Sequence, residues 1–301
     1  MTTEITLEQM VSVIRMPCQL VGNTSRVVCE PRSIDVGRQG SVAYCSAQPE
    51  AALRRINDSE ASVIIGPLDV DLHHLATHNK TCILCRRPRL AFIRIMKQFF
   101  SESRIEGIHA TAVIHDEATL GEHVYVGPFT YIGKAYVGSN TVIDGHSHIY
   151  DKVWIGEDCT IQAGAVIGSR GFGMERNEYG EFEDFPHIGG VVIGDGVVVG
   201  AGVTIARGTI ENTVIGRGSR IDALSEISHN VQIGAHCGMC ASCVVSGSSI
   251  VNESTWIAAG SLVREGLRIG SRSVLGLGSV VVNDVRKGVV VYGVPAREKG
   301  R

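Results

Sequence analysis

A repeat of six residues constrains the fold of this chain more than any other feature of its sequence. An aliphatic residue or Met stands at every sixth position from Ile215 to Val281, at twelve positions of twelve. Because only 44% of all residues are hydrophobic, chance would produce such a run with a probability well under roughly one in a thousand. The same spacing recurs in three earlier runs, Leu120 to Ile132, Val137 to Ile167 and Ile193 to Ile205.

A period of six predicts a solenoid. It matches neither the α-helical period nor the alternation of a flat strand, but it suits short strands joined by tight turns, with one apolar residue of each pointing inwards. Three such sides close a triangular coil, so residues 18 positions apart lie on the same face of neighbouring coils. The 24 repeat positions predict about eight coils, each rising by ~4.8 Å. The 36 glycines and 5% aromatic residues agree with a narrow repeating backbone.

Residues 168–192 interrupt the repeat with a segment rich in glycine, charged and aromatic residues. Loops that leave a rigid scaffold often carry function, so we interpret this segment as a binding loop. The alternative is a hairpin that only stiffens the solenoid.

The first hundred residues lack the repeat. Thr6 and Gln9 have the spacing of a capping box at the start of a helix, residues 61–65 and 81–85 have the composition of buried strands, and Pro88 begins a helix through Phe100. The sequence therefore predicts three parts: a small α/β domain at 1–104, a β-helix at 105–285 and a short tail at 286–301.

Composition narrows the function classes. A formal net charge of −3 and the lack of a long basic stripe argue against nucleic acid as a partner. We find no signal-peptide pattern and no apolar stretch near the ~20 residues that span a bilayer, so we expect a cytoplasmic protein without a membrane span. Nine scattered cysteines suit reduced thiols in such a compartment.

Two constellations could carry chemistry. His229 comes two positions after the inward Ile227, where a side chain can face a groove and act as a base near neutral pH; a solvated surface histidine is the alternative. Cys237, Cys240 and Cys243 have the spacing of metal ligands. However, Cys237 and Cys243 share the phase at which the repeat elsewhere uses small residues, so we expect core packing and no metal.

Several motifs resemble the UDP-3-O-acylglucosamine N-acyltransferases of lipid A biosynthesis and their relatives that act on other nucleotide amino sugars. The resemblance covers nearly the whole chain. It rests on residues 171–173, 185–194 and 207–216, and on the pairs Ile221-Asp222 and His229-Asn230. It implies a left-handed parallel β-helix, a uridine-binding first domain and a homotrimer with clefts between neighbouring chains. In such a trimer, His229 of one chain and the loop 168–192 of another would share a site.

The resemblance also implies roles for single residues. His229 would be the general base that removes a proton from the sugar amine, and Asp222 would orient it. Gly247, 18 positions after His229, would offer its backbone N–H to the oxyanion; base, carboxylate and amide donor are the groups that acyl transfer to an amine needs. No metal and no tightly bound cofactor is expected. The substrate-binding candidates are Tyr44, beside the uracil ring, Phe172, His187 and Asn230.

The sequence departs from the lipid A enzymes in two places. It has no second histidine in the turn 264–267, and its ending at 291–301 resembles coenzyme A-dependent acetyltransferases more than chains with a helical extension for acyl carrier protein. Acyl-CoA and acyl carrier protein therefore both stay open as the thioester donor. A CoA-dependent N-acetyl- or N-acyltransferase acting on another nucleotide amino sugar, for a surface polysaccharide, is the alternative.

Two further classes stay open beside these transferases. A zinc hydratase of the γ-carbonic anhydrase type needs three histidine ligands, and His229 and His236 have no fitting third. A non-catalytic scaffold subunit would share the solenoid without using His229.

Overall fold

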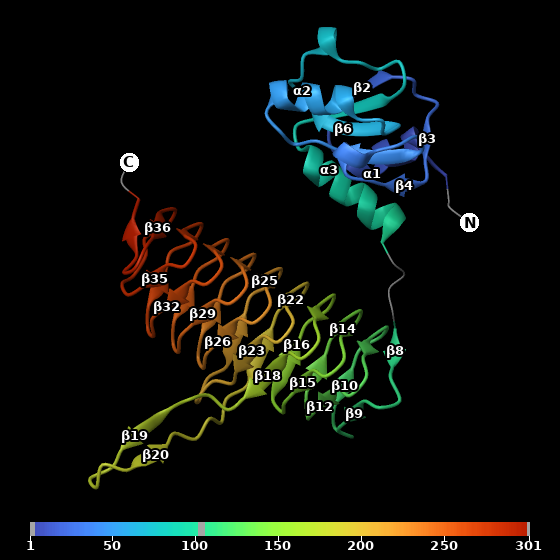
Figure 1. Cartoon of the computed structure of the whole chain (residues 1–301). Helices are drawn as coiled ribbons and strands as arrows, with labels where there is room; N and C mark the ends of the chain where they lie inside the picture. Colours follow the sequence, from blue (N-terminus) through green and yellow to red (C-terminus); the bar gives the residue numbers. More distant parts are fainter. Residues whose placement is uncertain (1–3, 102–105, 300–301) are drawn as a thin grey trace. The chain divides into compact units, whose positions relative to one another are not determined.

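The computed structural model describes residues 4–101 and 106–299. Internal contacts divide the chain into two compact units, Met1–Arg104 and Ile105–Arg301 (Figure 1). No helix in the described part of the chain is long and apolar enough to cross a membrane.

The first unit is built on a five-stranded sheet in the order β2-β7-β6-β5-β4. Strands β4 to β7 are parallel, and β2 runs antiparallel to β7. A small antiparallel pair, β1 and β3, lies outside this sheet. The strands are β1 Ile5–Thr6, β2 Cys18–Gly22, β3 Val27–Val28, β4 Glu30–Pro31, β5 Ser41–Tyr44, β6 Val63–Pro67 and β7 Thr81–Cys85.

Three α-helices pack on this sheet: α1 Leu7–Ile14, α2 Pro49–Asp58 and α3 Pro88–Ile95, which continues as a π-helical turn at Met96–Phe100. Short 3₁₀ turns lie at Ile34–Val36 and Leu72–His74. Alternate residues of β6 face opposite cores, because Val63 and Ile65 pack with α1 and α3 while Ile64 packs with α2. Thr6 and Gln9 form the predicted capping box. The elements predicted from this part of the sequence are therefore confirmed.

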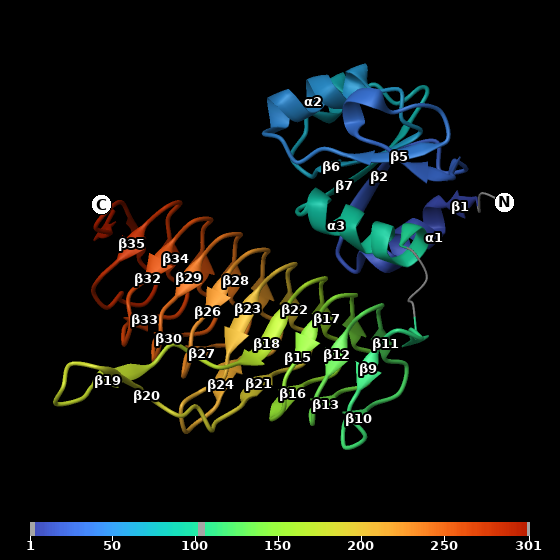
Figure 2. The same cartoon turned by 60° about the horizontal axis from the view of Figure 1, so that its bottom comes forward.

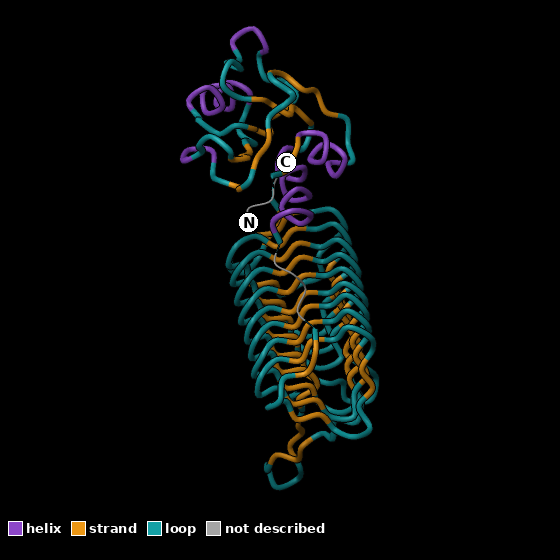
Figure 3. The backbone as a smooth tube through the Cα atoms, turned by 90° about the vertical axis from the view of Figure 1, so that its right-hand side faces the viewer, coloured by secondary structure: helices purple, strands orange, loops and turns teal. Residues whose placement is uncertain are grey.

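The second unit winds as a parallel β-helix with three flat sides (Figures 2 and 3). One sheet has eight strands: β10 Thr119–Leu120, β13 Tyr136–Val137, β16 Val153–Ile155, β21 Val191–Ile193, β24 Thr213–Ile215, β27 Gln232–Ile233, β30 Ile250–Val251 and β33 Arg268–Ile269. A second has nine: β9 Val113–Ile114, β12 Tyr131–Ile132, β15 His148–Ile149, β18 Val166–Ser169, β23 Thr204–Ala206, β26 Glu226–Ile227, β29 Val244–Val245, β32 Leu262–Val263 and β35 Val280–Val281. The third has eleven: β8 Gly107–Ile108, β11 Tyr125–Val126, β14 Val142–Ile143, β17 Thr160–Ile161, β22 Val198–Val199, β25 Arg220–Ile221, β28 Gly238–Met239, β31 Trp256–Ile257, β34 Val274–Leu275, β36 Val290–Tyr292 and β37 Arg297–Glu298.

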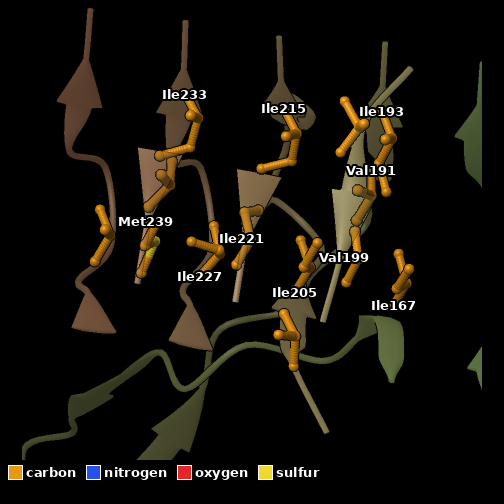
Figure 4. Packing of buried hydrophobic residues seen from close by; sticks show 14 of the residues in the cluster. Ile167, Val191, Ile193, Val199, Ile205, Ile215, Ile221, Ile227, Ile233 and Met239 are labelled. Atoms are coloured by element: carbon orange, nitrogen blue, oxygen red, sulfur yellow. The ribbon is translucent and has the colours of Figure 1, made fainter. Parts of the chain in front are cut away.

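The six-residue repeat forms the core of this β-helix. Its apolar positions line the interior (Figure 4), and from Ile221 to Val281 each repeat residue pairs with the one 18 positions later, as Ile227 does with Val245. Glycine often follows the inward residue because the next coil lies close; a Cβ on Gly234 would come 2.5 Å from the backbone nitrogen of Glu253. The predicted register is therefore confirmed.

The coil count differs from the prediction. One sheet has nine strands rather than the eight expected, because the winding begins before Leu120, at strands β8 and β9. Its first inward residues, Ile108 and Ile114, are still partly exposed, so they contribute little to the periodic apolar signal.

The segment expected to be a short tail also differs. Its described residues continue the third sheet, since β36 pairs with β34 in parallel and β37 folds back on β36. Arg286 and Glu298 form a two-bonded ion pair, at 3.0 and 2.6 Å, that holds this last turn together.

The segment 168–192 leaves the coil as a hairpin of β19 Met174–Arg176 and β20 Phe182–Asp184, which Figures 1 and 2 show projecting from the solenoid. Cys237 and Cys243 are buried at inward-facing positions, and their thiols contact the carbonyls of Asn252 at 3.2 Å and Ala258 at 3.1 Å. These two cysteines therefore pack in the core, as predicted.

Candidate active site

A groove of about 720 Å³ runs along one corner of the β-helix. It lies between the base of the hairpin segment, strand β26 and the corners of the next two coils. Its lining residues are Ser169, Arg170, Gly171, Phe172, Thr204, Ala206, Glu226, Ile227, Ser228, His229, Ser246, Gly247, Ser248, Glu265 and Gly266.

His229 stands at the corner that follows β26. One coil along, the same corner carries Gly247, because Ile227 pairs with Val245. A Cβ on Gly247 would lie 2.7 Å from Cε1 and 2.9 Å from Nε2 of His229. The imidazole therefore rests directly over Gly247, and any larger residue there would displace it.

The backbone N–H of Gly247 is available to a ligand. The neighbouring amides are occupied, since Ser246 donates to Val263 and Ser248 donates to the carbonyl of His229. Among residues 4–101 and 106–299, no acceptor binds the N–H of Gly247. An unpartnered amide beside an imidazole is a donor that an oxyanion can use.

Asn230 links His229 to the coil before it. It adopts the left-handed backbone conformation, with φ of 61°, and its Oδ1 accepts a hydrogen bond from the Thr209 backbone at 2.7 Å. Its Nδ2 therefore lies on the other side, 3.2 Å from His229 Nδ1. An Nδ1 that accepts this N–H leaves the proton of the neutral ring on Nε2. For Nε2 to act as the base, the proton of the neutral ring must instead be on Nδ1. That N–H then needs an acceptor, which the Asn230 amide nitrogen cannot provide.

The pKa of His229 is lowered, first by burial and then by the nearby His187, while the backbone carbonyl of Phe172 opposes the shift. Burial disfavours the charged imidazolium more than the neutral ring. The shift favours the neutral ring, which has a lone pair with which to accept a proton.

His187, at the foot of the hairpin segment, packs edge-on against His229 with ring centroids 5.2 Å apart. Its Nδ1 lies 2.8 Å from the carbonyl of Phe185 and so carries the proton, while its buried Nε2 has no partner in the described residues. A Cβ on Gly171 would lie 2.7 Å from that Nε2 and 2.9 Å from His229 Cβ. Glycine at 171 thus lets the segment close over both rings, and Phe172 stands 86% exposed beside them.

Four of the predicted site residues therefore meet at His229: Phe172, His187, Asn230 and Gly247. The hairpin segment reaches His229 of its own chain, whereas the sequence analysis expected it to come from a neighbouring chain. A parallel coil explains this, since β18 and β26 stand in the same sheet with only β23 between them.

Asp222 does not meet His229 within the described chain. It follows β25 on the adjacent side, lines a separate cavity of about 260 Å³ with Cys240 and Trp256, and accepts the backbone N–H of Ala223 at 2.8 Å. The seven-residue offset between Asp222 and His229 is one hexad plus one, which places them on adjacent sides of the triangle. The role predicted for Asp222 stays a prediction.

Tyr44 ends strand β5 in the first unit. Its ring packs on Phe92 of α3, with centroids 4.8 Å apart and planes at 31°, and it is half-buried. One ring face is thus used inside the unit. The predicted contact with uracil stays a prediction.

The sequence analysis missed two carboxylates of the groove. Glu226 accepts a hydrogen bond from the Ser228 hydroxyl at 3.1 Å. Glu265 lies at the same corner as His229 but two coils along, and the residue at this corner of the intervening coil is Gly247, which has no side chain of its own. Applying the 18-residue period twice from His229 would have found Glu265.

Fold and site together define a hexapeptide-repeat transferase, and residues 134–169 match the family described as bacterial transferase hexapeptide (six repeats). The chain is 33% identical over 247 residues to UDP-3-O-acylglucosamine N-acyltransferase 1 of Legionella pneumophila (strain Paris), covering 74% of this chain and 67% of that protein. UDP-3-O-acylglucosamine N-acyltransferase of Pseudomonas savastanoi is 33% identical over 213 residues, 64% of this chain and 59% of its own length. The chain belongs to the UDP-3-O-acylglucosamine N-acyltransferase family.

Solved structures give the same fold. UDP-N-acetylglucosamine acyltransferase of Francisella novicida superposes with a TM-score of 0.59 at 24% identity, over 64% of this chain and 70% of that one. UDP-N-acetylglucosamine O-acyltransferase of Moraxella catarrhalis superposes with a TM-score of 0.57 at 27% identity, over 64% and 74%. The prediction of a left-handed parallel β-helix is confirmed.

Proposed function

We propose that this protein transfers an acyl group from a thioester donor to the amine of a UDP-linked amino sugar. The observation that carries the proposal is the half-buried imidazole of His229, which rests over a glycine whose N–H has no acceptor among the described residues. The names of the relatives support an acylated glucosamine nucleotide as the acceptor.

The groove supplies the groups that this reaction needs. The amine nitrogen attacks the thioester carbonyl while His229 takes its proton. The Gly247 N–H stabilises the negative charge that develops on the carbonyl oxygen. The new C–N bond completes the amide as the C–S bond breaks, and the protonated His229 returns its proton to the departing thiolate.

In this proposal, Asp222 contacts His229 only when several copies of the chain assemble into an oligomer. Closed rings suit a rod with unlike contact faces, and a homotrimer would place the Asp222 face of one chain against the His229 corner of the next. The carboxylate would then accept the Nδ1 proton and leave Nε2 free as the base. Phe172, His187 and Asn230 would shape the acceptor site, and Tyr44 would hold the uracil ring.

The test is thiol release from acetyl-CoA, a longer 3-hydroxyacyl-CoA and the matching acyl carrier protein, each against a panel of UDP-amino sugars. We expect turnover with one pair and a loss of about 10²- to 10⁴-fold in kcat for His229→Ala. His236→Ala is the matched control, because His236 is a histidine at the next corner of the same coil and does not line the groove. Equal loss in both variants, or no thiol release with any pair, would contradict the proposal.

A further inference from the structure

A second pocket, of about 530 Å³, lies within the first unit. Arginines and apolar residues line it in equal number, with no acidic side chain among them. The lining residues are Arg15, Met16, Pro17, Leu68, Arg86, Arg87, Leu90 and Arg94. Tyr44 is not part of this lining, so the pocket is distinct from the predicted uracil contact.

The pocket lies where parallel strands end and a helix begins. Leu68 directly follows β6, and Arg86 directly follows β7. Arg87 is the N-cap of α3 and makes no side-chain capping bond. The carboxyl edge of a parallel sheet is the usual place for ligands in α/β folds, and the first turn of a helix favours an anion there.

One of the four arginines already has partners. The Arg94 guanidinium donates to the carbonyls of Ile14 and Arg15, at the end of α1. Its charge therefore offsets the negative end of that helix.

The other three arginines are not balanced by the protein. Within residues 4–101 and 106–299, no ion pair or side-chain hydrogen bond holds Arg15, Arg86 or Arg87. Elsewhere in the unit, Glu30 pairs with Arg32 and Arg38. Three unpaired guanidinium groups around one pocket create a positive potential that attracts an anion.

The apolar half of the lining narrows the class of ligand that the pocket can bind. Met16, Pro17, Leu68 and Leu90 give the pocket walls that suit an organic group rather than a bare ion. The planar fork of arginine matches phosphate oxygens with two parallel hydrogen bonds. We propose that this pocket binds the phosphate group of an organic phosphate ester, with Arg15, Arg86 and Arg87 as its ligands.

Two sources could supply such a phosphate: a nucleoside diphosphate or the 3′-phosphate of coenzyme A. Calorimetric titration of the full chain with UDP, uridine, CoA and dephospho-CoA separates them. UDP binding that exceeds uridine binding and is weakened in R86Q/R87Q assigns the pocket to a nucleoside diphosphate. CoA binding that exceeds dephospho-CoA binding and is weakened in the same variant assigns it to the 3′-phosphate.

The variant R86Q/R87Q tests the residues. We expect this variant to bind the phosphate ligand about tenfold or more weakly than the wild type. We also expect the affinity of the wild type for this ligand to fall with added salt. Arg89→Gln is the matched control, since Arg89 lies on the same helix, is exposed and does not line the pocket. Unchanged affinity in R86Q/R87Q, or no binding of any phosphate ligand to the wild type, would overturn the proposal.

Two further measurements separate a loss of phosphate binding from misfolding and from a lack of turnover. Circular dichroism melting checks the double variant, and Arg15→Gln, on a different segment, repeats the test if R86Q/R87Q fails to fold. Calorimetry needs no turnover, so arginine-dependent phosphate binding without thiol release would leave this site standing and count only against the acyltransferase function.

Discussion

Gly247 shows how strictly the backbone under His229 is specified. A Cβ at this position would lie 2.7 Å from the His229 ring, so Gly247→Ala forces the imidazole out of its place. We expect kcat to fall by about 10²-fold, because a misplaced base costs roughly this much, while the melting temperature changes little, because the added methyl group meets the end of a half-buried side chain rather than the backbone. Steady-state kinetics and thermal melting check both parts. Full activity in Gly247→Ala would show that the ring position is not critical.

The lowered pKa of His229 sets a direction for the pH dependence. Catalysis needs the neutral ring, so kcat/KM stays level at neutral pH and falls only as the pH drops through a pKa below the ordinary value of about 6.5. His187→Gln removes the neighbouring imidazole, which lowers the pKa of His229, and should move this fall to higher pH. A pH–rate profile of both proteins measures the shift, and coincident profiles would contradict it.

The same pKa shift affects folding. The unfolded chain binds the proton of His229 more tightly than the folded one, so this contribution to stability is present above about pH 6.5 and is lost as the pH falls towards the lower folded pKa.

Glu265 lines the same groove as His229, where its negative charge can attract an amine in its ammonium form. We expect Glu265→Gln to raise the KM for the amino sugar about three- to tenfold, with kcat and the KM for the donor unchanged. The effect should shrink at a pH where the free amine predominates. Kinetics with each substrate varied in turn check this, and a change confined to the donor KM would refute it.

At the scale of the element, stability resides in the stacked inward residues rather than in the hairpin. Ile149 is fully buried in β15, so Ile149→Ala should lower the free energy of unfolding by about 2–5 kcal/mol. Replacing the exposed hairpin tip 177–181 by a short glycine-serine turn should change it by less than about 1 kcal/mol. Urea unfolding of both variants at one fixed protein concentration measures their free energies of unfolding. An equal loss of stability in the two variants would show that the hairpin belongs to the core.

Strands and register could be predicted because each inward residue is set by its own hexad and each partner lies one coil away. The ends were harder to place. Ile108 pairs with Val126, but its coil is covered on one side only, so the sequence pattern fades there. Strand β37 depends on a turn back onto β36, and the six-residue repeat does not predict this turn.

At the scale of the whole molecule, the proposed pairing of Asp222 with His229 of a neighbouring chain can be tested by mixing. Asp222→Ala and His229→Ala should each be nearly inactive alone. Co-expressed in a cyclic trimer, they should recover about one quarter of the wild-type sites, because each site takes one residue from each neighbour. Light scattering checks the assembly. A stable monomer, or no recovery in the mixed oligomer, would contradict the pairing.

The sequence by itself determined the solenoid, its register and the position of His229 over Gly247, because all three follow from one period that repeats locally along the chain. Only the tertiary structure decided which other side chains share a space. The fold of the hairpin segment brought His187 to its own His229, the triangle set Asp222 on another side, and the edge of the first sheet gathered Arg15 with Arg86 and Arg87. These encounters join segments far apart in sequence, and their distances depend on how the chain turns back rather than on any local pattern.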